Sequence, residues 1–440
     1  MGRQGSLNPS PYHLIVSIAC TIDQELDLVI RTNRLLDRFL RYVRIDTAAD
    51  PASADYPSSP GQFELGRVLL EELIAMGAED AHQDANGLVW ATVPSTAGPG
   101  LPTVALLAHL DTSPEAPGGS VNPQVVEAYD GRPIELLSGL MLDAATAPTL
   151  ASLVGKTLIT TDGTTLLGGD DKAGVAIIME VAHSLIESPN LAHGPVRLLF
   201  TCDEEIGRGT DKIDLEKLGA TVAYTLDGGG AGVIDVETFS ADAMRVSFIG
   251  NNIHPAIAKG QMVNSLRGAA AMVAALPLHE CTPETTGGRD GFIHVHDIHG
   301  GVGRCDVDLI LRSFQTAQLD DFAEQVARTA RAACENVPGL RVEIQRRKQY
   351  RNLAEGLKRR PEAVELARQA FANLGHKCEL TVVRGGTDGS QLTEKGLPTP
   401  NLSSGQHNIH SLREFACLDE MGQAAEHVIE LLRLWGEQRL

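Results

Sequence analysis

The sequence predicts an α/β fold in which a mainly parallel sheet carries helices on both faces, with a smaller two-layer α+β unit inserted into it. Three observations carry this prediction. Short, continuous apolar runs alternate with stretches whose apolar residues recur at helical spacing, which is typical of βαβ units. In the middle of the chain the pattern changes to alternating strands around helices. The length of 440 residues also exceeds what one hydrophobic core usually serves.

The part of the chain before residue 240 supplies the first elements of the main unit. A helix is predicted where apolar residues form one stripe, as Leu36, Leu40 and Val43 do. A strand buried on both faces is predicted where a run is continuously apolar, as TVALLA is. In chain order, the predictions are helices at 30–43 and 63–76, a strand at 103–108, a helix at 175–186, and strands at 196–200 and 221–226.

The middle of the chain is predicted to form the inserted unit, after which the chain returns to the main unit. We therefore divide the chain into an N-terminal extension at 1–28, expected to be disordered, a main domain at 29–239 and 351–440, and an inserted domain at 240–350. The predicted elements from here on are strands at 244–248, 307–311 and 341–344 with helices at 265–275 and 322–333, then a helix at 362–374, a strand at 379–383 and a final helix at 421–435.

Composition and charge exclude several functional classes. The formal net charge is −20, and an acidic surface repels phosphate backbones, so no nucleic-acid partner is expected. No apolar run reaches the ~18 residues that a membrane span needs, so no membrane partner is expected either. The seven cysteines are scattered and form no CxxC pair, which fits the reducing cytoplasm better than a disulfide framework.

Metal-type ligands lie after a predicted strand and on a glycine-rich turn. The strand at 103–108 is followed by His109, and Asp111 lies two residues further on. Neutral imidazole is a good zinc ligand, and a nearby carboxylate can hold its other ring nitrogen. Asp170 and Asp171 stand on the glycine-rich turn LGGDDKAG before a helix. One of them could instead cap the helix, so a cap and a metal bridge both remain open.

Two further strand ends carry carboxylates. Three acids, Asp203 to Glu205, follow the strand VRLLF, and Asp227 follows the strand TVAYTL. Three adjacent acids repel one another unless a cation offsets them, although a solvated acidic loop is the alternative. In a metal site, one glutamate can ligate while its neighbour acts as base on a water. The carboxyl ends of parallel strands meet in one crevice, so these groups are expected to converge.

Other patterns argue against competing chemistries. No GxSxG elbow is present, and Gly228–Gly230 lacks the GxGxxG spacing of dinucleotide-binding turns. Cys202 has no partner that would make it a nucleophile, so it is expected to pack in the core. The tract HVHDIH contains His294, His296 and His299, but it falls on a predicted strand of the inserted unit, where metal binding is not expected.

Taken in order, the motifs resemble a known family. AHLDTSP, TLLGGDDKAG, FTCDEEIGRG, YTLDGGG, GNNIHPAIAKG, VRGGTDGSQL and NIHSLREF are similar to those of peptidase T. These tripeptide aminopeptidases belong to a larger group of two-zinc exopeptidases that includes carboxypeptidase G and aminoacylase. The likeness runs from about residue 33 to 434, and ITTDGTTLLGGDDKAG and GNNIHP point to peptidase T within the group.

The resemblance implies a role for each matching residue. Spacing alone does not select His410 over His407, but the match to a histidine ahead of Glu414-Phe415 does. The implied roles are His109 and Asp227 as ligands of one zinc, Glu205 and His410 as ligands of the second, Asp170 as the bridge, Asp111 as the residue that orients His109, and Glu204 as the general base.

Three residues outside the metal set also match. His254, in the inserted domain, would help to stabilise the oxyanion, in this group often across a dimer interface. Arg312 and Arg384 would hold a substrate carboxylate, which a guanidinium fork binds in a bidentate manner. The resemblance also implies a homodimer through the inserted domain. The chain departs from the family pattern at Ala256 and at 411–413, which affects the expected pocket and leaves the metal ligands in place.

The function expected from the resemblance is release of the N-terminal residue from short peptides, chiefly tripeptides, by a water that two Zn²⁺ ions activate. Co²⁺ or Mn²⁺ could replace zinc. Two alternatives remain open: a related two-zinc dipeptidase, carboxypeptidase or N-acyl-amino-acid amidohydrolase, and a metal-binding protein without catalytic activity. The expected location is the cytoplasm.

Overall fold

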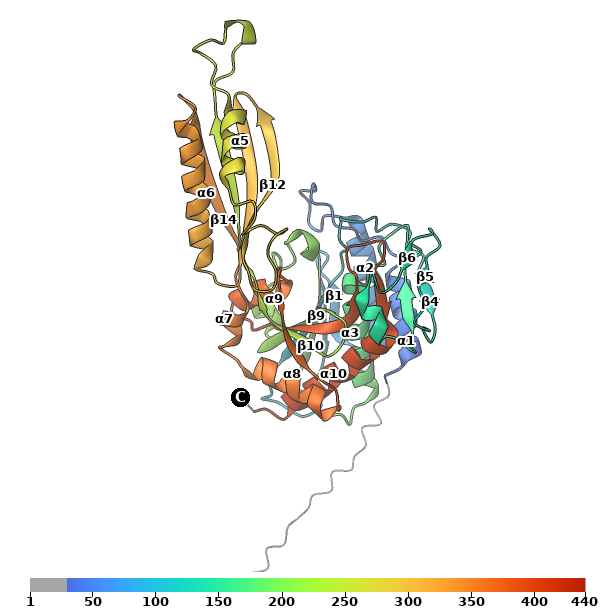
Figure 1. The fold of residues 1–440 in the computed structure, drawn as a ribbon. Coiled ribbons are helices and arrows are strands. Elements are labelled where there is room, and N and C mark those ends of the chain that lie inside the picture. Colours follow the sequence, from blue (N-terminus) through green and yellow to red (C-terminus); the bar gives the residue numbers. More distant parts are fainter. Residues whose placement is uncertain (1–29, 440) are drawn as a thin grey trace, which may run out of the picture.

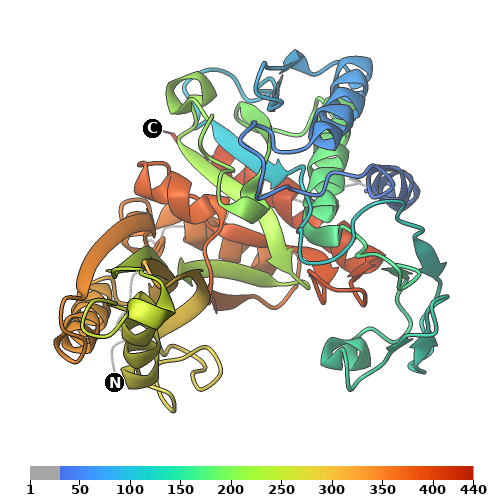
Figure 2. The same cartoon turned by 90° about the horizontal axis from the view of Figure 1, so that it is seen from above.

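The structure is a computed structural model that describes residues 30–439, so the extension predicted at 1–28 lies outside the described residues. The main body is built on an eleven-stranded sheet. A second, four-stranded sheet with two long helices stands away from this body (Figure 1). From above, the olive and orange elements of that unit lie to one side of the main body (Figure 2).

The centre of the main sheet is parallel, as predicted. Three of its four parallel strands are the apolar runs of the sequence, and the earliest of these in the chain, β3, is buried along its whole length. The fourth strand was not predicted, because NLSSGQH is polar. The neighbouring parallel strands are, in order, β8 (Val196–Thr201), β3 (Val104–His109), β9 (Val222–Gly229) and β16 (Asn401–His407).

Antiparallel strands extend the sheet at both edges, so the sheet is mixed. Sequence patterns did not predict the strands at these two edges, which have only three to five residues and show little periodicity. They are β2 (Val89–Val93) and β1 (Glu79–Gln83) beside β8, and β17 (Phe415–Cys417), β7 (Leu158–Thr160) and β4 (Gln124–Val126) beside β16. In addition, β10 (Val233–Thr238) pairs with β16 and with β15 (Glu379–Val383), which is the strand predicted at 379–383. A separate two-stranded sheet consists of β5 (Ile134–Glu135) and β6 (Met141–Leu142).

Helices cover both faces of the sheet. The hydroxyl of Tyr224 on β9 donates to the carbonyl of Ala363 in α8 and accepts from Trp435 in α10. The next residue, Thr225, points to the opposite face, where it packs against Gly389 of α9. The helices of the main body are α1 (Thr32–Tyr42), α2 (Pro60–Met76), α3 (Gly169–Glu187), α4 (Leu215–Leu218), α7 (Ala354–Leu357), α8 (Glu362–Asn373), α9 (Asp388–Glu394) and α10 (Leu418–Gly436).

The second sheet begins at Ser240 and ends at Tyr350, and all its strand pairs are antiparallel. Helices α5 and α6 pack on it and share its hydrophobic core. The elements, in sheet order and then chain order, are β12 (Phe292–Gly301), β13 (Arg304–Ser313), β11 (Ser240–Ile249), β14 (Arg341–Tyr350), α5 (Ser265–Ala275) and α6 (Gln318–Glu335). None of the helices between residues 30 and 439 has the length and apolarity that crossing a bilayer requires.

Candidate active site

His109 is the last residue of β3, and two contacts fix its ring. Its Nδ1 lies 3.0 Å from the main-chain carbonyl oxygen of Asp111 and 3.4 Å from a carboxylate oxygen of the same residue. The Asp111 carboxylate also accepts hydrogen bonds from the backbone N–H groups of Glu204 and Glu205, both at 3.0 Å. Asp111 therefore links the histidine to the loop that carries the two glutamates, and leaves Nε2 of His109 free to face the site.

Asp170 stands between two histidines. One of its carboxylate oxygens lies 3.0 Å from Nε2 of His109, and the other lies 3.2 Å from Nε2 of His410. Although burial opposes it, the contacts with these histidines hold the pKa of Asp170 below its usual range. A carboxylate that offers one oxygen to each of two ligand sets has the arrangement of a bridging metal ligand.

Each histidine has a second acidic neighbour. Nε2 of His410 lies 3.0 Å from Oε2 of Glu205, and Nε2 of His109 lies 3.8 Å from Oδ1 of Asp227. Burial, with Asp170 nearby, raises the pKa of Asp227 to about 7. The result is two adjacent sets of ligand atoms that share Asp170, drawn from β3, β9, the turn after β8, the start of α3 and the loop after β16.

The donor set fits a metal. Oε1 of Glu205 is buried and has no hydrogen-bond partner between residues 30 and 439. An acceptor in that position is costly unless a cation or another donor reaches it. Imidazole nitrogens together with carboxylate oxygens are the ligands that zinc and similar divalent ions take. The site therefore has the composition and the unsatisfied acceptor that a metal centre requires.

The acidic run after β8 separates into three roles. The carboxylate of Asp203 points away from the metal ligands and accepts hydrogen bonds from Ser58 and Gln62, the shortest at 2.6 Å. Glu205 belongs to the ligand set. Glu204 lines the cavity beside it, and burial together with the nearby Asp388 raises the pKa of Glu204 well above its usual range.

A cavity of about 1860 Å³ contains this site and reaches the inserted unit. The metal-type ligands Asp170, Glu205 and Asp227 line it on the side of the main sheet, and Arg312 lines it on the side of the second sheet. Arg312 is mostly buried, which lowers the pKa of its guanidinium to about 10. One cavity therefore joins an acidic end to a basic end.

Arg384 lines the same cavity but is already bound. Its Nη1 donates to the carbonyl oxygens of Gly288 and Asp290, each at 2.9 Å, and its Nη2 donates to the hydroxyl of Thr286 at 3.1 Å. Its guanidinium carbon also lies 5.1 Å from the centre of the Phe239 ring. Arg384 therefore ties the end of β15 to the loop before β12, and part of its donor capacity remains for a ligand.

The structure does not bring His254 to this cavity. His254 follows β11, whose ten residues start beside the main body, so it lies roughly 30 Å along the second sheet from that end. Its side chain is exposed, and Nδ1 accepts a hydrogen bond from the backbone N–H of Ala256 at 3.2 Å. Figure 1 shows how far the second sheet extends from the main body.

Comparisons with known proteins agree with the geometry. A model of peptidase family M20/M25/M40 matches residues 168–434. A Peptidase T of Geobacillus kaustophilus is 43% identical over 406 residues, which is 92% of this chain and 98% of the relative. The chain belongs to the peptidase T group of this family. The chain is therefore a peptidase, and the His, Asp and Glu side chains gathered at its site can hold a metal ion, as in a metalloenzyme.

Solved structures share the fold of this peptidase. A tripeptidase from Staphylococcus aureus superposes with a TM-score of 0.74 at 23% identity, covering 93% of this chain and 100% of that one. A dinuclear metal-binding peptidase of family M20 from Bacillus subtilis gives a TM-score of 0.63 at 16% identity, covering 92% and 98%. At these identities the likeness concerns the fold, which the sequence analysis predicted correctly.

Sequence reasoning missed several groups that hold the peptidase's site in place. The Glu414 carboxylate accepts hydrogen bonds from the backbone N–H groups of Leu167, Gly168 and Asp170 at 2.8, 2.9 and 3.0 Å. Asp171, next to the bridging position, accepts from the backbone N–H of His109 at 3.1 Å. In the sequence, Glu414 serves only to align the last histidine, and no spacing rule links it to a turn 244 or more residues earlier.

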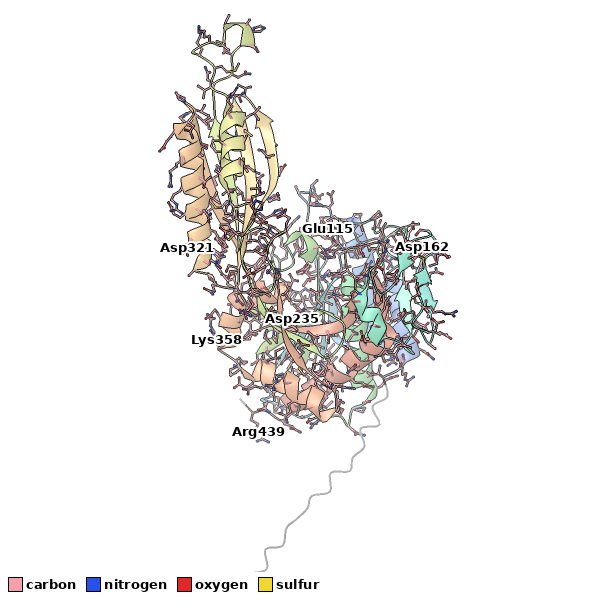
Figure 3. All side chains as sticks on the ribbon, viewed as in Figure 1. Glu115, Asp162, Asp235, Asp321, Lys358 and Arg439 are labelled. Atoms are coloured by element: carbon pink, nitrogen blue, oxygen red, sulfur yellow. The ribbon has the colours of Figure 1, made fainter. Side chains whose placement is uncertain are left out.

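Two further contacts surround the site. A carboxylate oxygen of Glu115 lies 3.2 Å from Nδ1 of His410, and Figure 3 labels Glu115 on the side of the main body that faces the second sheet. Asp388 accepts a hydrogen bond from the hydroxyl of Thr201 at 2.9 Å.

Cys202 is buried, and burial raises the pKa of its thiol, as expected of a core residue.

The histidine tract of the inserted unit lies on β12. His299, Asp297 and Asp308 come within ligand distance of one another on an exposed surface. Arg245, however, already binds Asp308 through two hydrogen bonds, at 2.6 and 2.8 Å. A cation at this group would compete with the guanidinium.

Proposed function

We propose that this chain is a two-metal tripeptide aminopeptidase that releases the N-terminal residue from short peptides. The observation that carries the proposal is the position of Asp170, with one carboxylate oxygen toward each of two histidine-containing ligand sets. His109 and Asp227 would hold one metal, Glu205 and His410 the other, and Asp170 both. Zinc is the metal proposed, with Co²⁺ or Mn²⁺ as substitutes. When bound, such ions supply Lewis acidity that brings the pKa of a water toward about 7.

Glu204 is the proposed general base. It lies beside Glu205 in the cavity, and its backbone N–H is held by Asp111 at 3.0 Å. Burial and Asp388 raise the pKa of Glu204, which strengthens it as a proton acceptor, whereas metal ions held by the neighbouring ligands would lower that pKa and keep the carboxylate ionised. Glu204 takes the proton from the attacking water and then hands it to the amine of the departing dipeptide.

The two arginines account for the preference for short peptides. Arg312 offers its guanidinium to the C-terminal carboxylate, and Arg384 lines the same end of the cavity with its remaining N–H donors. Because both lie opposite the acidic end, the distance between the two ends limits the length of a peptide that contacts both. A peptide without a free carboxylate is expected to bind more weakly.

His254 needs a second copy of the chain to act. It lies at the far end of β11, away from the cavity of its own chain. We propose a homodimer through the inserted domain, residues 240–350, in which His254 of one copy stabilises the oxyanion in the cavity of the other.

The six cysteines that the structure describes are all free, which supports the proposed cytoplasmic location.

The general-base assignment is tested with Glu204→Gln. The variant should bind metal as the unaltered enzyme does and lose at least about 10²-fold in kcat, the scale typical of a lost general base. Glu216→Gln, on the exposed surface of α4, is the matched control and should retain activity. An active Glu204→Gln enzyme would show that another group takes the proton.

A further inference from the structure

Four residues form one row across the end of the second sheet that faces the main body. Phe292 on β12 lies opposite Arg312 on β13, Arg312 lies opposite Ala241 on β11, and Ala241 lies opposite Tyr350 on β14. Residues directly opposite one another project from the same face of a sheet. Phe292, Arg312 and Tyr350 all line the cavity that contains the metal-type ligands.

Within this row the Arg312 side chain reaches the ring of Tyr350. The guanidinium carbon lies 4.9 Å from the ring centre, within the range of a cation–π interaction. The two residues stand on strands separated by β11, roughly 10 Å apart, so the arginine must cross the residue between them. That residue is Ala241, whose methyl group leaves the path open.

The Tyr350 ring also packs against the backbone of Gly386. Gly386 lies against it so closely that a Cβ at this position would come within 2.4 Å of Cζ and within 2.6 Å of both Cε atoms. The backbone of Gly386 therefore restricts the position of the ring that the Arg312 guanidinium contacts. The Tyr350 hydroxyl is buried and has no hydrogen-bond partner in the described part of the chain, so the ring is the part that contacts Arg312.

The choice of an aromatic neighbour has a chemical consequence. Across residues 30–439, no carboxylate forms an ion pair with Arg312, and burial alone accounts for the lowered pKa of its guanidinium. A carboxylate partner would occupy two of the five N–H donors, whereas the face of a ring stabilises the cation and occupies none. Arg384 shows the contrast, since three of its hydrogen bonds already go to the loop at 286–290.

We propose that Tyr350 is a positioning residue for substrate selection: its ring holds the Arg312 guanidinium over the cavity with its N–H donors free for the C-terminal carboxylate of the peptide. This inference rests on the proposed tripeptide aminopeptidase activity. It assigns the selectivity for a free carboxylate to a pair, Arg312 with Tyr350, in which only the arginine touches the substrate.

The test compares one tripeptide with its C-terminal amide. For the free acid, Tyr350→Leu should lower kcat/KM about ten-fold through KM, which corresponds to about 1.4 kcal/mol. For the amide, which gives Arg312 no carboxylate, the same variant should change kcat/KM less than about two-fold. Tyr350→Phe keeps the ring and should behave as the unaltered enzyme with both substrates. Tyr350→Met serves as a second ring-free variant if the leucine variant folds poorly.

A double-mutant cycle tests whether Tyr350 affects peptide binding through Arg312. Arg312→Met should show the same selective loss, and adding Tyr350→Leu to it should cause no further loss with the free acid. Equal losses on acid and amide, a loss in Tyr350→Phe, or additive losses in the double variant would each overturn the inference while leaving the peptidase activity intact. If the unaltered enzyme cleaves neither substrate, the proposed function fails and this inference fails with it.

Discussion

The role of Glu414 gives the most sharply defined consequence of the site geometry. Its carboxylate accepts three backbone N–H groups from the turn at 167–170, which carries Asp170. In Glu414→Gln, one of the two acceptor oxygens becomes an N–H₂ donor that faces a backbone N–H. At least one charge-assisted hydrogen bond, worth about 1.5–3 kcal/mol, is lost and a donor is left unsatisfied.

The loss should appear in metal binding rather than in the chemical step. Residues that support metal ligands typically change metal affinity 10- to 100-fold when they are replaced, or about 1.4–2.8 kcal/mol. Chelated enzyme is titrated with Zn²⁺ against a competing chelator, and kcat is measured at saturating metal. Glu414→Gln should bind zinc about 10- to 100-fold more weakly and regain most of its kcat at high zinc.

The matched control is again Glu216→Gln, which removes a carboxylate from an exposed helix. Unchanged zinc affinity in a correctly folded Glu414→Gln enzyme would refute the positioning role. A kcat that stays low at saturating zinc would show that Glu414 takes part in the chemistry itself.

Two other predictions follow from groups outside the metal set. If His254 serves the cavity of a partner, mixing inactive Glu204→Gln and His254→Ala enzymes after subunit exchange should restore activity to about one quarter of the unaltered level, because half the dimers are mixed and each has one intact site; no recovery would contradict the shared site. Burial of His427 lowers its pKa to about 4, so its stabilising contribution is present above about 6.5, the unfolded value, and is lost as pH falls toward 4, by about 3 kcal/mol. Urea unfolding of chelated enzyme at several pH values gives the free energy of unfolding as a function of pH. This free energy should change less steeply with pH in His427→Gln than in the unaltered enzyme, and equal slopes would show that His427 does not cause the pH dependence.

The parts of this structure that sequence predicted are those in which one local pattern suffices. Buried parallel strands are predicted by the apolar runs at 103–108, 196–200 and 221–226. The ligands His109 and Asp227 come directly after two of these runs. The polar run NLSSGQH gives no such sign, although β16 lies inside the main sheet. Its neighbours in space, not its own residues, make it a strand.

The parts that sequence could not predict depend on register and on backbone contacts. The row of Phe292, Arg312, Ala241 and Tyr350 exists because four strands align at these positions, and a slip of one residue would point the side chains to the other face. Glu414 acts on backbone N–H groups, which leave no trace in residue type. Sequence grouped Asp203 with Glu204 and Glu205, yet its carboxylate turns to Ser58.

The central claim is that the cavity beside Asp170 binds two metal ions together with a peptide whose N-terminus is free. The most direct measurement is hydrolysis of an unblocked tripeptide and of its N-acetylated twin, by chelated enzyme with and without added Zn²⁺. The account predicts cleavage of the unblocked tripeptide alone, lost on chelation and restored by zinc. Cleavage of the acetylated peptide would contradict aminopeptidase specificity, and cleavage that survives chelation would contradict the metal site.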